Sequence, residues 1–186
     1  MRGRSEITAA ELAKILIDAR ARTLALVSDL TDEQLMGPRL PTVNPLLWEI
    51  GHVSWFQEKW VLRHRGKKKP IRGDGDALYD SGRVPHDSRW DLPLPSRDET
   101  LAYMQQVMNR IIERLGAIEL DREEMYFHYL AVFHEDMHDE AFTYTRQTLG
   151  YPRPPFTALS EGARDGQTSG GPLSGDVEIP GGTFLL

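Results

Sequence analysis

Residues 121–149, DREEMYFHYLAVFHEDMHDEAFTYTRQTL, decide the fold of this chain. Apolar side chains and two histidines recur there at helical spacing, and Gly150 and Pro152 end the stretch. The pattern predicts one long amphipathic helix from about 121 to 149. One broad face of this helix carries Leu130, Phe133, His134, Met137, His138, Ala141 and Thr145.

Two further long helices are predicted from their capping signals. Capping boxes at 8–11 and 96–99 begin them, and a similar box at 31–34 begins a short helical turn. Gly116 closes the helix that follows the box at 96–99. The apolar positions are Leu12, Leu16, Ala19, Thr23, Leu26 and Leu30 in the first helix, and Leu101, Met104, Met108, Ile111 and Leu115 in the later one.

The fourth long helix is predicted to open with Asn44 as its cap and Pro45 at its first position. It runs to about His64 and stops at Gly66. In one rotation, its inward stripe is Trp48, His52, Trp55, Phe56 and Lys59; in another, it buries Leu47, Gly51 and Trp55. Four long amphipathic helices predict an all-α four-helix bundle over residues 1–153.

Two irregular segments complete the predicted organisation. Residues 67–95 form a long connection whose aromatic and charged content favours an ordered loop. Residues 154–175 have the composition of a linker, and 176–186 resume strand-like character. Because a strand without a partner is unstable, we expect the chain to stop at the first strand of a second domain. The alternative is a strand that packs back on the bundle.

Composition limits the classes of function. A length of 186 residues accommodates one domain, or one domain and the opening of another. The net charge of −6 argues against a nucleic-acid partner, and the basic run at 64–69 follows a helix end, where cations suit the helix dipole. No stretch is apolar enough to span a membrane. The absence of cysteine excludes a thiolate metal site and fits a cytoplasmic location.

The candidate chemistry lies in three histidines. His134 and His138 are four residues apart on one helix, so both imidazoles can face one metal ion. His52, on the aromatic stripe of another helix, is the candidate third ligand. Three imidazoles leave coordination positions open and do not select among zinc, copper, iron and nickel.

Other readings of these residues remain open. A His-x-x-x-His pair can arise by coincidence, and a single interior histidine is commonly structural. His64 and His128 have no partner at ligand spacing and are expected to be structural or surface residues. Among the nearby acids, Glu140 and Asp139 are expected to orient imidazole N–H groups. The adjacent acids Glu135 and Asp136 are expected to be exposed to solvent.

At these residues the chain resembles a known family. Residues 44–58, NPLLWEIGHVSWFQE, resemble the iron-binding helix of ergothioneine-type sulfoxide synthases, and His134, His138 and Glu140 match their second motif. Residues 177–186 resemble the opening of the formylglycine-generating-enzyme-like (sulfatase-modifying-factor-like) domain that follows the DinB-like bundle in that family. Residues 78–93 and 55–58 are more similar to selenoneine synthases.

The resemblance implies an oxidoreductase that uses Fe(II) and dioxygen to join sulfur or selenium to the imidazole of hercynine. His52, His134 and His138 would hold the iron, while Arg83 and Arg89 would bind a thiol or selenosugar donor. The family's catalytic tyrosine lies in its second domain, so the resemblance assigns no catalytic residue here and implies a bundle that is inactive alone.

Two other functions remain open from the sequence. Bundles of the DinB type include metal-dependent thiol S-transferases and isomerases, which use three histidines with zinc or nickel and need no second domain. The strand-like residues 176–186 count against that interpretation. The other alternative is a non-enzymatic helical bundle in which the histidines are merely packed.

Overall fold

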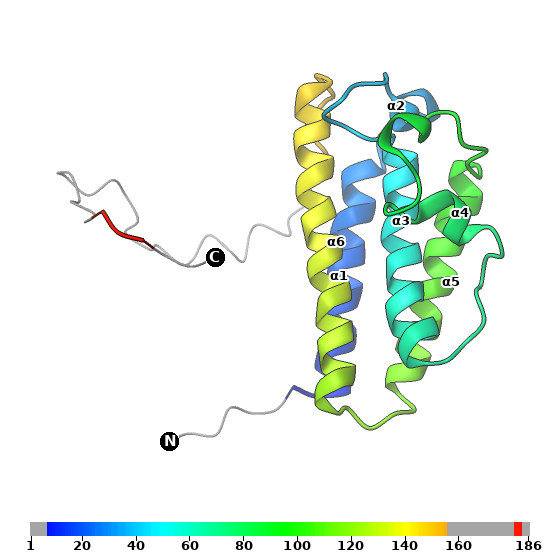
Figure 1. Cartoon of the computed structure of the whole chain (residues 1–186), viewed down its shortest axis with the longest axis vertical. Helices are drawn as coiled ribbons and strands as arrows, with labels where there is room; N and C mark the ends of the chain where they lie inside the picture. The colour runs from blue at the N-terminus through cyan, green and yellow to red at the C-terminus, as the bar shows by residue number, and fades with distance from the viewer. Residues whose placement is uncertain (1–6, 156–180, 184–186) are drawn as a thin grey trace. The chain divides into compact units, whose positions relative to one another are not determined.

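Four long helical segments lie side by side and form a bundle, as predicted (Figure 1). The computed structural model describes residues 7–155 and 181–183. The long segments are α1 (Ala9–Val27), α3 (Leu46–Gln57) with its continuation η1 (Glu58–Arg65), α5 (Arg97–Leu115) and α6 (Arg122–Thr148). Shorter elements in the connections are α2 (Asp32–Met36), α4 (Gly75–Tyr79) and η2 (His86–Ser88). Helix α1 packs mainly on α6, and α3 mainly on α5.

The predicted linker at 154–175 and strand at 176–186 fall almost entirely outside the described residues. They remain predictions. Within the part that the structure describes, every element is helical, and no helix there is long and apolar enough to cross a membrane.

Helix starts follow the predicted capping chemistry with one exception. The boxes at 8–11, 31–34 and 96–99 all form reciprocal side-chain to backbone hydrogen bonds. The prediction of Asn44 as a cap is wrong, because Pro45 occupies that position without a side-chain cap. The Asn44 amide instead donates to the carboxylate of Glu49 at 2.6 Å.

Helix α3 is buried on all sides, so neither predicted rotation describes it fully. Every residue from Leu46 to Trp55 is buried, because α2, α4, α5 and α6 surround the helix. Phe56 and Lys59 are only half-buried. From Glu58 the segment widens into a π-helix, and Gly66 ends it by donating to the carbonyl of Val61.

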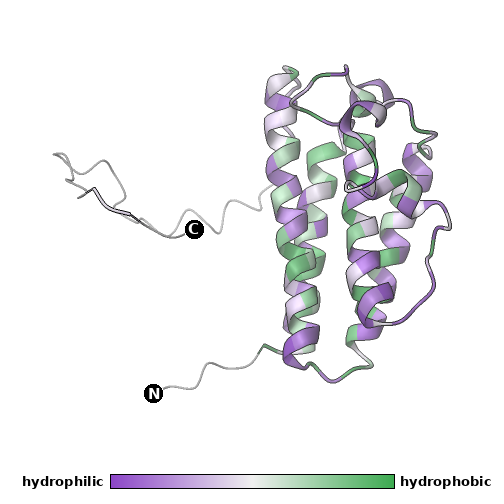
Figure 2. Cartoon of the chain, viewed as in Figure 1, coloured by the Kyte–Doolittle hydropathy of each residue, from purple (hydrophilic) through white to green (hydrophobic). Residues whose placement is uncertain are grey.

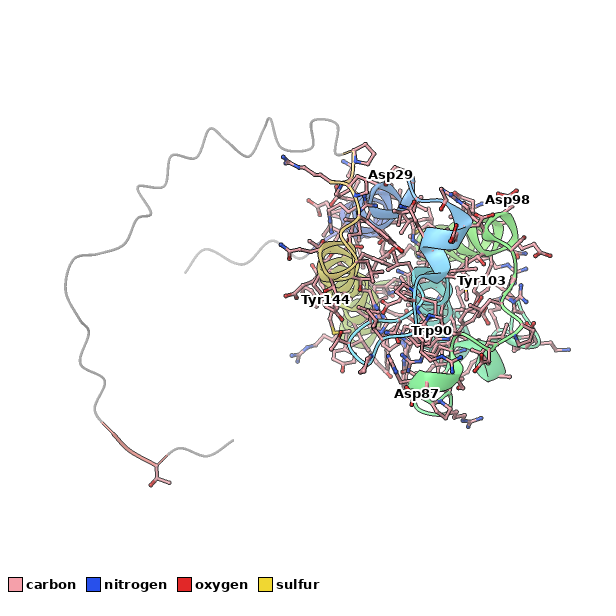
Figure 3. All side chains as sticks on the ribbon, turned by 90° about the horizontal axis from the view of Figure 1, so that it is seen from above. Asp29, Asp87, Trp90, Asp98, Tyr103 and Tyr144 are labelled. Carbon is pink, nitrogen blue, oxygen red and sulfur yellow. The ribbon has the colours of Figure 1, made fainter. Side chains whose placement is uncertain are left out.

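Helix α6 faces the bundle differently from the prediction. Phe133 and Met137 are 65% and 55% exposed, so their placement with the inward residues is wrong. Figure 2 shows polar and apolar residues interleaved along the long helices, and Figure 3 labels Tyr144 on α6, away from the buried Tyr103. The buried side of α6 includes Phe127, His128, Ala131, Val132, Glu135, Ala141, Phe142, Thr145 and Arg146.

Glu135 explains this orientation, and its predicted exposure to solvent is wrong. The carboxylate has no exposed surface and accepts hydrogen bonds from Arg20 (2.6 Å), Gln57 (2.6 Å) and Thr23 (2.9 Å). These donors belong to α1 and α3. A buried carboxylate needs such partners, so α6 turns Glu135 inward. The neighbouring Asp136 lies at the surface.

The connection at 67–95 is ordered, as expected, and contains α4 and η2. The indole of Trp48 donates to the carbonyl of Leu78, and that of Trp55 donates to Asp76, each at 2.7 Å. Tyr79 packs directly on α3, since a Cβ atom on Gly51 would lie 2.3 Å from its ring. These contacts place α4 beside the middle of α3.

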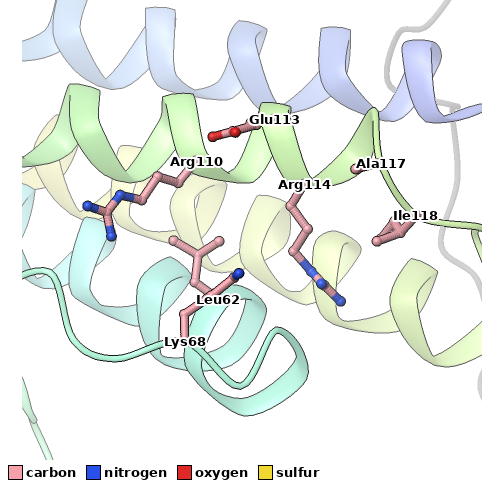
Figure 4. Close-up of a pocket in the computed structure, with 7 residues that line it drawn as sticks. All are labelled: Leu62, Lys68, Arg110, Glu113, Arg114, Ala117 and Ile118. Atoms are coloured by element: carbon pink, nitrogen blue, oxygen red, sulfur yellow. The ribbon is translucent and has the colours of Figure 1, made fainter.

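The basic run at 64–69 borders a hollow at one end of the bundle. Arg65 pairs with acids at the start of α6, including Glu123 at 2.9 Å. Beside it, a hollow of about 370 Å³ lies between η1 with the residues that follow it and the end of α5 (Figure 4). It shares no residue with the three candidate ligands. Its lining comprises Leu62, Lys68, Arg110, Glu113, Arg114, Ala117 and Ile118.

We expect Glu135→Gln to lower the free energy of unfolding by about 3 to 5 kcal/mol, because the buried Arg20 guanidinium loses its charged partner. Urea unfolding followed by circular dichroism measures the change. The matched control is Asp136→Asn, which alters a half-exposed pair with Arg22 and should cost less than about 1 kcal/mol. Equal effects of the two variants would contradict the role given to Glu135.

Candidate metal centre

Three histidines from two helices converge in the structure, as the sequence predicted. His52 comes from α3, and His134 and His138 come from α6. One ring nitrogen from each lies within 4.8 Å of the other two. The ring centroids are separated by 5.1 Å between His52 and His134, 4.9 Å between His52 and His138, and 4.5 Å between His134 and His138.

The ring of His52 is held by a backbone carbonyl and an indole. Its Nδ1 lies 2.7 Å from the carbonyl oxygen of Tyr79. A carbonyl only accepts, so Nδ1 carries the proton and Nε2 keeps a free lone pair. The ring of Trp48 stacks on it at 4.7 Å with an 11° tilt. Burial lowers the pKa of His52 to about 4, which keeps the imidazole neutral at pH 7.

His138 is oriented by Glu49, and the expected partner Glu140 is not used. The Nδ1 of His138 lies 2.5 Å from a carboxylate oxygen of Glu49, whose residue is 2% exposed. Burial raises the pKa of Glu49, but the hydrogen bonds from His138 and Asn44, together with electrostatic attraction to His138 and His52, outweigh burial and hold the pKa below its usual value. The ionised carboxylate therefore accepts a hydrogen bond from the Nδ1–H group of His138. Glu140 is exposed and makes no hydrogen bond among the described residues.

His134 lies flat against an aromatic ring. Its imidazole stacks on Phe56 at 3.6 Å with a 4° tilt. Burial lowers the pKa of His134 to about 2, so this imidazole is also neutral at pH 7. Its Nδ1 is buried and has no hydrogen-bond partner within the described part of the chain.

The donor set fits a divalent transition-metal ion. Neutral imidazoles are ligands for iron, zinc, copper and nickel, and burial keeps His52 and His134 in that neutral form. On two of the rings, Nδ1 is already engaged by Tyr79 or Glu49, which leaves Nε2 for a metal. Three protein ligands would leave further coordination positions open.

The two arginines expected at a donor pocket occupy different environments. Arg83 is 77% exposed, and its one ion pair within the described residues is with Asp80, at 3.6 Å. Arg89 is 9% exposed, donates to the side-chain oxygen of Asn44 at 2.6 Å, and lies 3.9 Å from the ring of Trp48. Burial lowers its pKa. Their role in substrate binding stays a prediction.

His64 and His128 lie outside the cluster, as expected. His64 is exposed on η1. His128 is fully buried, and its Nδ1 lies 2.7 Å from the carbonyl oxygen of Glu124.

Sequence reasoning missed the groups that orient the rings. Glu49 was visible as the one acid on the helix 46–57, three residues before His52, but its partner on α6 was not. The Tyr79 carbonyl is a backbone group and leaves no sequence signal. Asp139, expected to orient an imidazole, is instead 2.7 Å from the hydroxyl of Thr23.

Asp139 generates a pH-dependent prediction for the metal-free protein. Burial raises its pKa from 3.8 to about 7. Between these values the unfolded chain is ionised at Asp139 while the folded protein keeps the proton. The contribution of Asp139 to the free energy of unfolding is therefore fully present below about pH 4 and is lost as the pH rises through about 7.

Asp139→Asn removes this titration, so we expect the variant to gain stability relative to wild type between pH 4 and 8. Thermal melting at several pH values measures the difference. The control Asp136→Asn should show no comparable pH-dependent gain. If the stability difference between Asp139→Asn and wild type stays constant across this pH range, the pKa of Asp139 is not raised in the folded protein.

Comparisons with known proteins agree with the helical architecture. The model of the DinB superfamily matches residues 15–142, which include all three clustered histidines. The chain belongs to the DinB superfamily.

Three mycobacterial relatives share the name hercynine oxygenase. The protein of Mycolicibacterium thermoresistibile is 35% identical over 133 residues, which are 70% of this chain and 29% of the relative. The protein of Mycolicibacterium smegmatis is 31% identical over 177 residues, which are 94% of this chain and 40% of the relative. The protein of Mycobacterium tuberculosis is 33% identical over 132 residues, which are 70% of this chain and 31% of the relative. The matched part of this chain thus spans between 29% and 40% of each relative's length.

Proposed function

We propose that this chain is the metal-binding bundle of a non-haem Fe(II), dioxygen-dependent synthase that forms a C–S or C–Se bond to the imidazole of hercynine. The observation that carries the proposal is the convergence of three imidazoles, with one ring nitrogen of each within 4.8 Å of the others, in a DinB-superfamily bundle. The relatives named hercynine oxygenase support both hercynine as substrate and an oxidoreductase activity.

His52, His134 and His138 would hold the iron, which supplies a site where dioxygen and a chalcogen donor can bind together. The chain's own groups prepare this site. Tyr79 and Glu49 hold two of the rings with Nε2 available. The stacked rings of Trp48 and Phe56 restrict ring rotation and exclude water from one side of each imidazole.

The substrates under this proposal are small molecules: hercynine, a thiol or selenosugar donor, and dioxygen. Because the chain spans less than half of each relative, much of the substrate-binding surface is proposed to lie in a further domain. Beyond the three ligands, we assign no catalytic residue to the described part of the chain. We therefore propose that the bundle alone binds metal but turns over little product.

A second candidate is a DinB-type metal-dependent thiol S-transferase or isomerase. The donor set favours it as much as the synthase, since three imidazoles suit zinc and nickel as well as iron. The family match at 15–142 also falls within the bundle alone. The identity of the bound metal and a requirement for dioxygen distinguish the two enzymes.

The first test is metal content, measured by mass spectrometry on anaerobically purified protein. We expect about one iron per chain in wild type and in His64→Ala, which alters an exposed histidine outside the cluster. His52→Ala and His134→Ala should lose the metal. His134→Ala should keep its helical circular dichroism, because the bundle core contributes far more stability than one ligand.

The outcomes separate the candidates. Stoichiometric zinc or nickel would replace the synthase with the transferase or isomerase. Retention of no metal after chelator-free purification would leave a non-enzymatic bundle. Loss of helical structure in His134→Ala would show that the metal is needed for folding.

A further inference from the structure

Arg89 is joined to two of the three clustered histidines by two separate routes. One route passes through Asn44 and Glu49, and the other passes through Trp48. We propose that Arg89 is a positioning residue of the metal centre, which holds His138 by the first route and His52 by the second. This inference rests on the proposed metal-binding function.

The first route is a continuous chain of short hydrogen bonds. Arg89 donates to the Oδ1 atom of Asn44 at 2.6 Å, and the Nδ2 atom of Asn44 donates to Glu49 at 2.6 Å. The other carboxylate oxygen of Glu49 lies 2.5 Å from Nδ1 of His138. A guanidinium only donates and a carboxylate only accepts, so an amide between them has one possible orientation. The polarity of the chain therefore fixes the proton of His138 on Nδ1.

Charge also connects the two ends of this route. Glu49 is a buried carboxylate, and a buried charge needs a compensating partner. The Glu49 charge acts on Arg89 across the Asn44 amide. The guanidinium of Arg89 is the positive group that faces Glu49 through Asn44, at a remove of two hydrogen bonds of 2.6 Å each.

The second route is a stack of flat groups. The guanidinium of Arg89 lies 3.9 Å from the ring of Trp48, and that ring lies 4.7 Å from the nearly parallel ring of His52. The indole nitrogen of Trp48 also donates to the carbonyl of Leu78. Arg89 therefore confines Trp48 from one side, and Trp48 limits rotation of His52 about its own axis.

The same contacts leave Arg89 poorly placed to hold a substrate carboxylate. One terminal nitrogen donates to Asn44, the other lies 3.4 Å from the carbonyl of Val84, and Trp48 lies beside the guanidinium. Arg83, six residues earlier, is mostly exposed and has none of these contacts. The two arginines, paired by sequence, have different roles in this proposal.

The test compares Arg89→Met with Arg83→Met, a matched substitution on the same segment. Nitrogen-15 NMR of the metal-free chain reports which nitrogen of His52 and His138 carries the proton. Anaerobic chelator competition reports affinity for Fe(II). In Arg89→Met we expect both rings to lose their fixed Nδ1–H form and iron affinity to fall roughly 10- to 100-fold. Arg83→Met should match wild type in both measurements.

A folded Arg89→Met variant with unchanged ring protonation and iron affinity would overturn the proposal. Weaker binding of a donor substrate with both measurements unchanged would assign Arg89 to the substrate instead. Because the NMR measurement needs no metal, it still decides the positioning role if the wild-type chain binds no iron, an outcome that would refute only the proposed function.

Asn44→Leu provides a second variant if Arg89→Met does not fold. It interrupts the first route and leaves Trp48 in place, so only the protonation of His138 should change. An equal change at His52, or no change at His138, would overturn the two-route arrangement. Arg89→Lys keeps the positive charge but lacks the planar group. It should therefore retain the Nδ1–H form of His138 more fully than that of His52.

Discussion

The buried hydrogen bonds of Glu135 are the constraint on which the site depends. This carboxylate draws Arg20 of α1 and Gln57 of α3 to one point on α6. Leaving either the acid or the guanidinium unpaired inside the bundle would be costly, so the rotation of α6 is set by polar contacts as much as by apolar packing. His134 is adjacent to Glu135 in the chain, and His138 lies one turn later. The same rotation that satisfies Glu135 therefore directs both imidazoles towards His52.

The candidate metal centre is built on the most deeply buried of the long helices. Helix α3 is enclosed on all sides, which obliges its polar side chains to find partners inside the protein. Glu49 finds His138 and Asn44, and His52 finds the Tyr79 carbonyl. Those partners lie on α6 and in the connections that precede α3 and follow η1. The connections, and not the four long helices alone, therefore determine how the imidazoles are presented.

Local chemistry was predictable, and long-range polar pairing was not. A capping box involves residues three apart, so its sequence pattern already contains both partners, and all three boxes formed. Helical spacing likewise placed His134 and His138 on one face. The prediction that Phe133 and Met137 face inward was wrong because it considered hydrophobicity alone and placed Glu135 in solvent. Its partner Arg20 is 115 positions away, and nothing local indicates that pairing.

The sequence by itself determined the all-α class, the extents of the long helices and the three histidines, because periodicity, capping and ligand spacing are short-range properties. Only the tertiary structure decided that Glu49, and not Glu140, contacts His138, and that Arg89 is buried while Arg83 is exposed. These outcomes depend on which side of each helix turns inward and on how the connection at 67–95 packs on α3. Both result from contacts between residues distant in the chain.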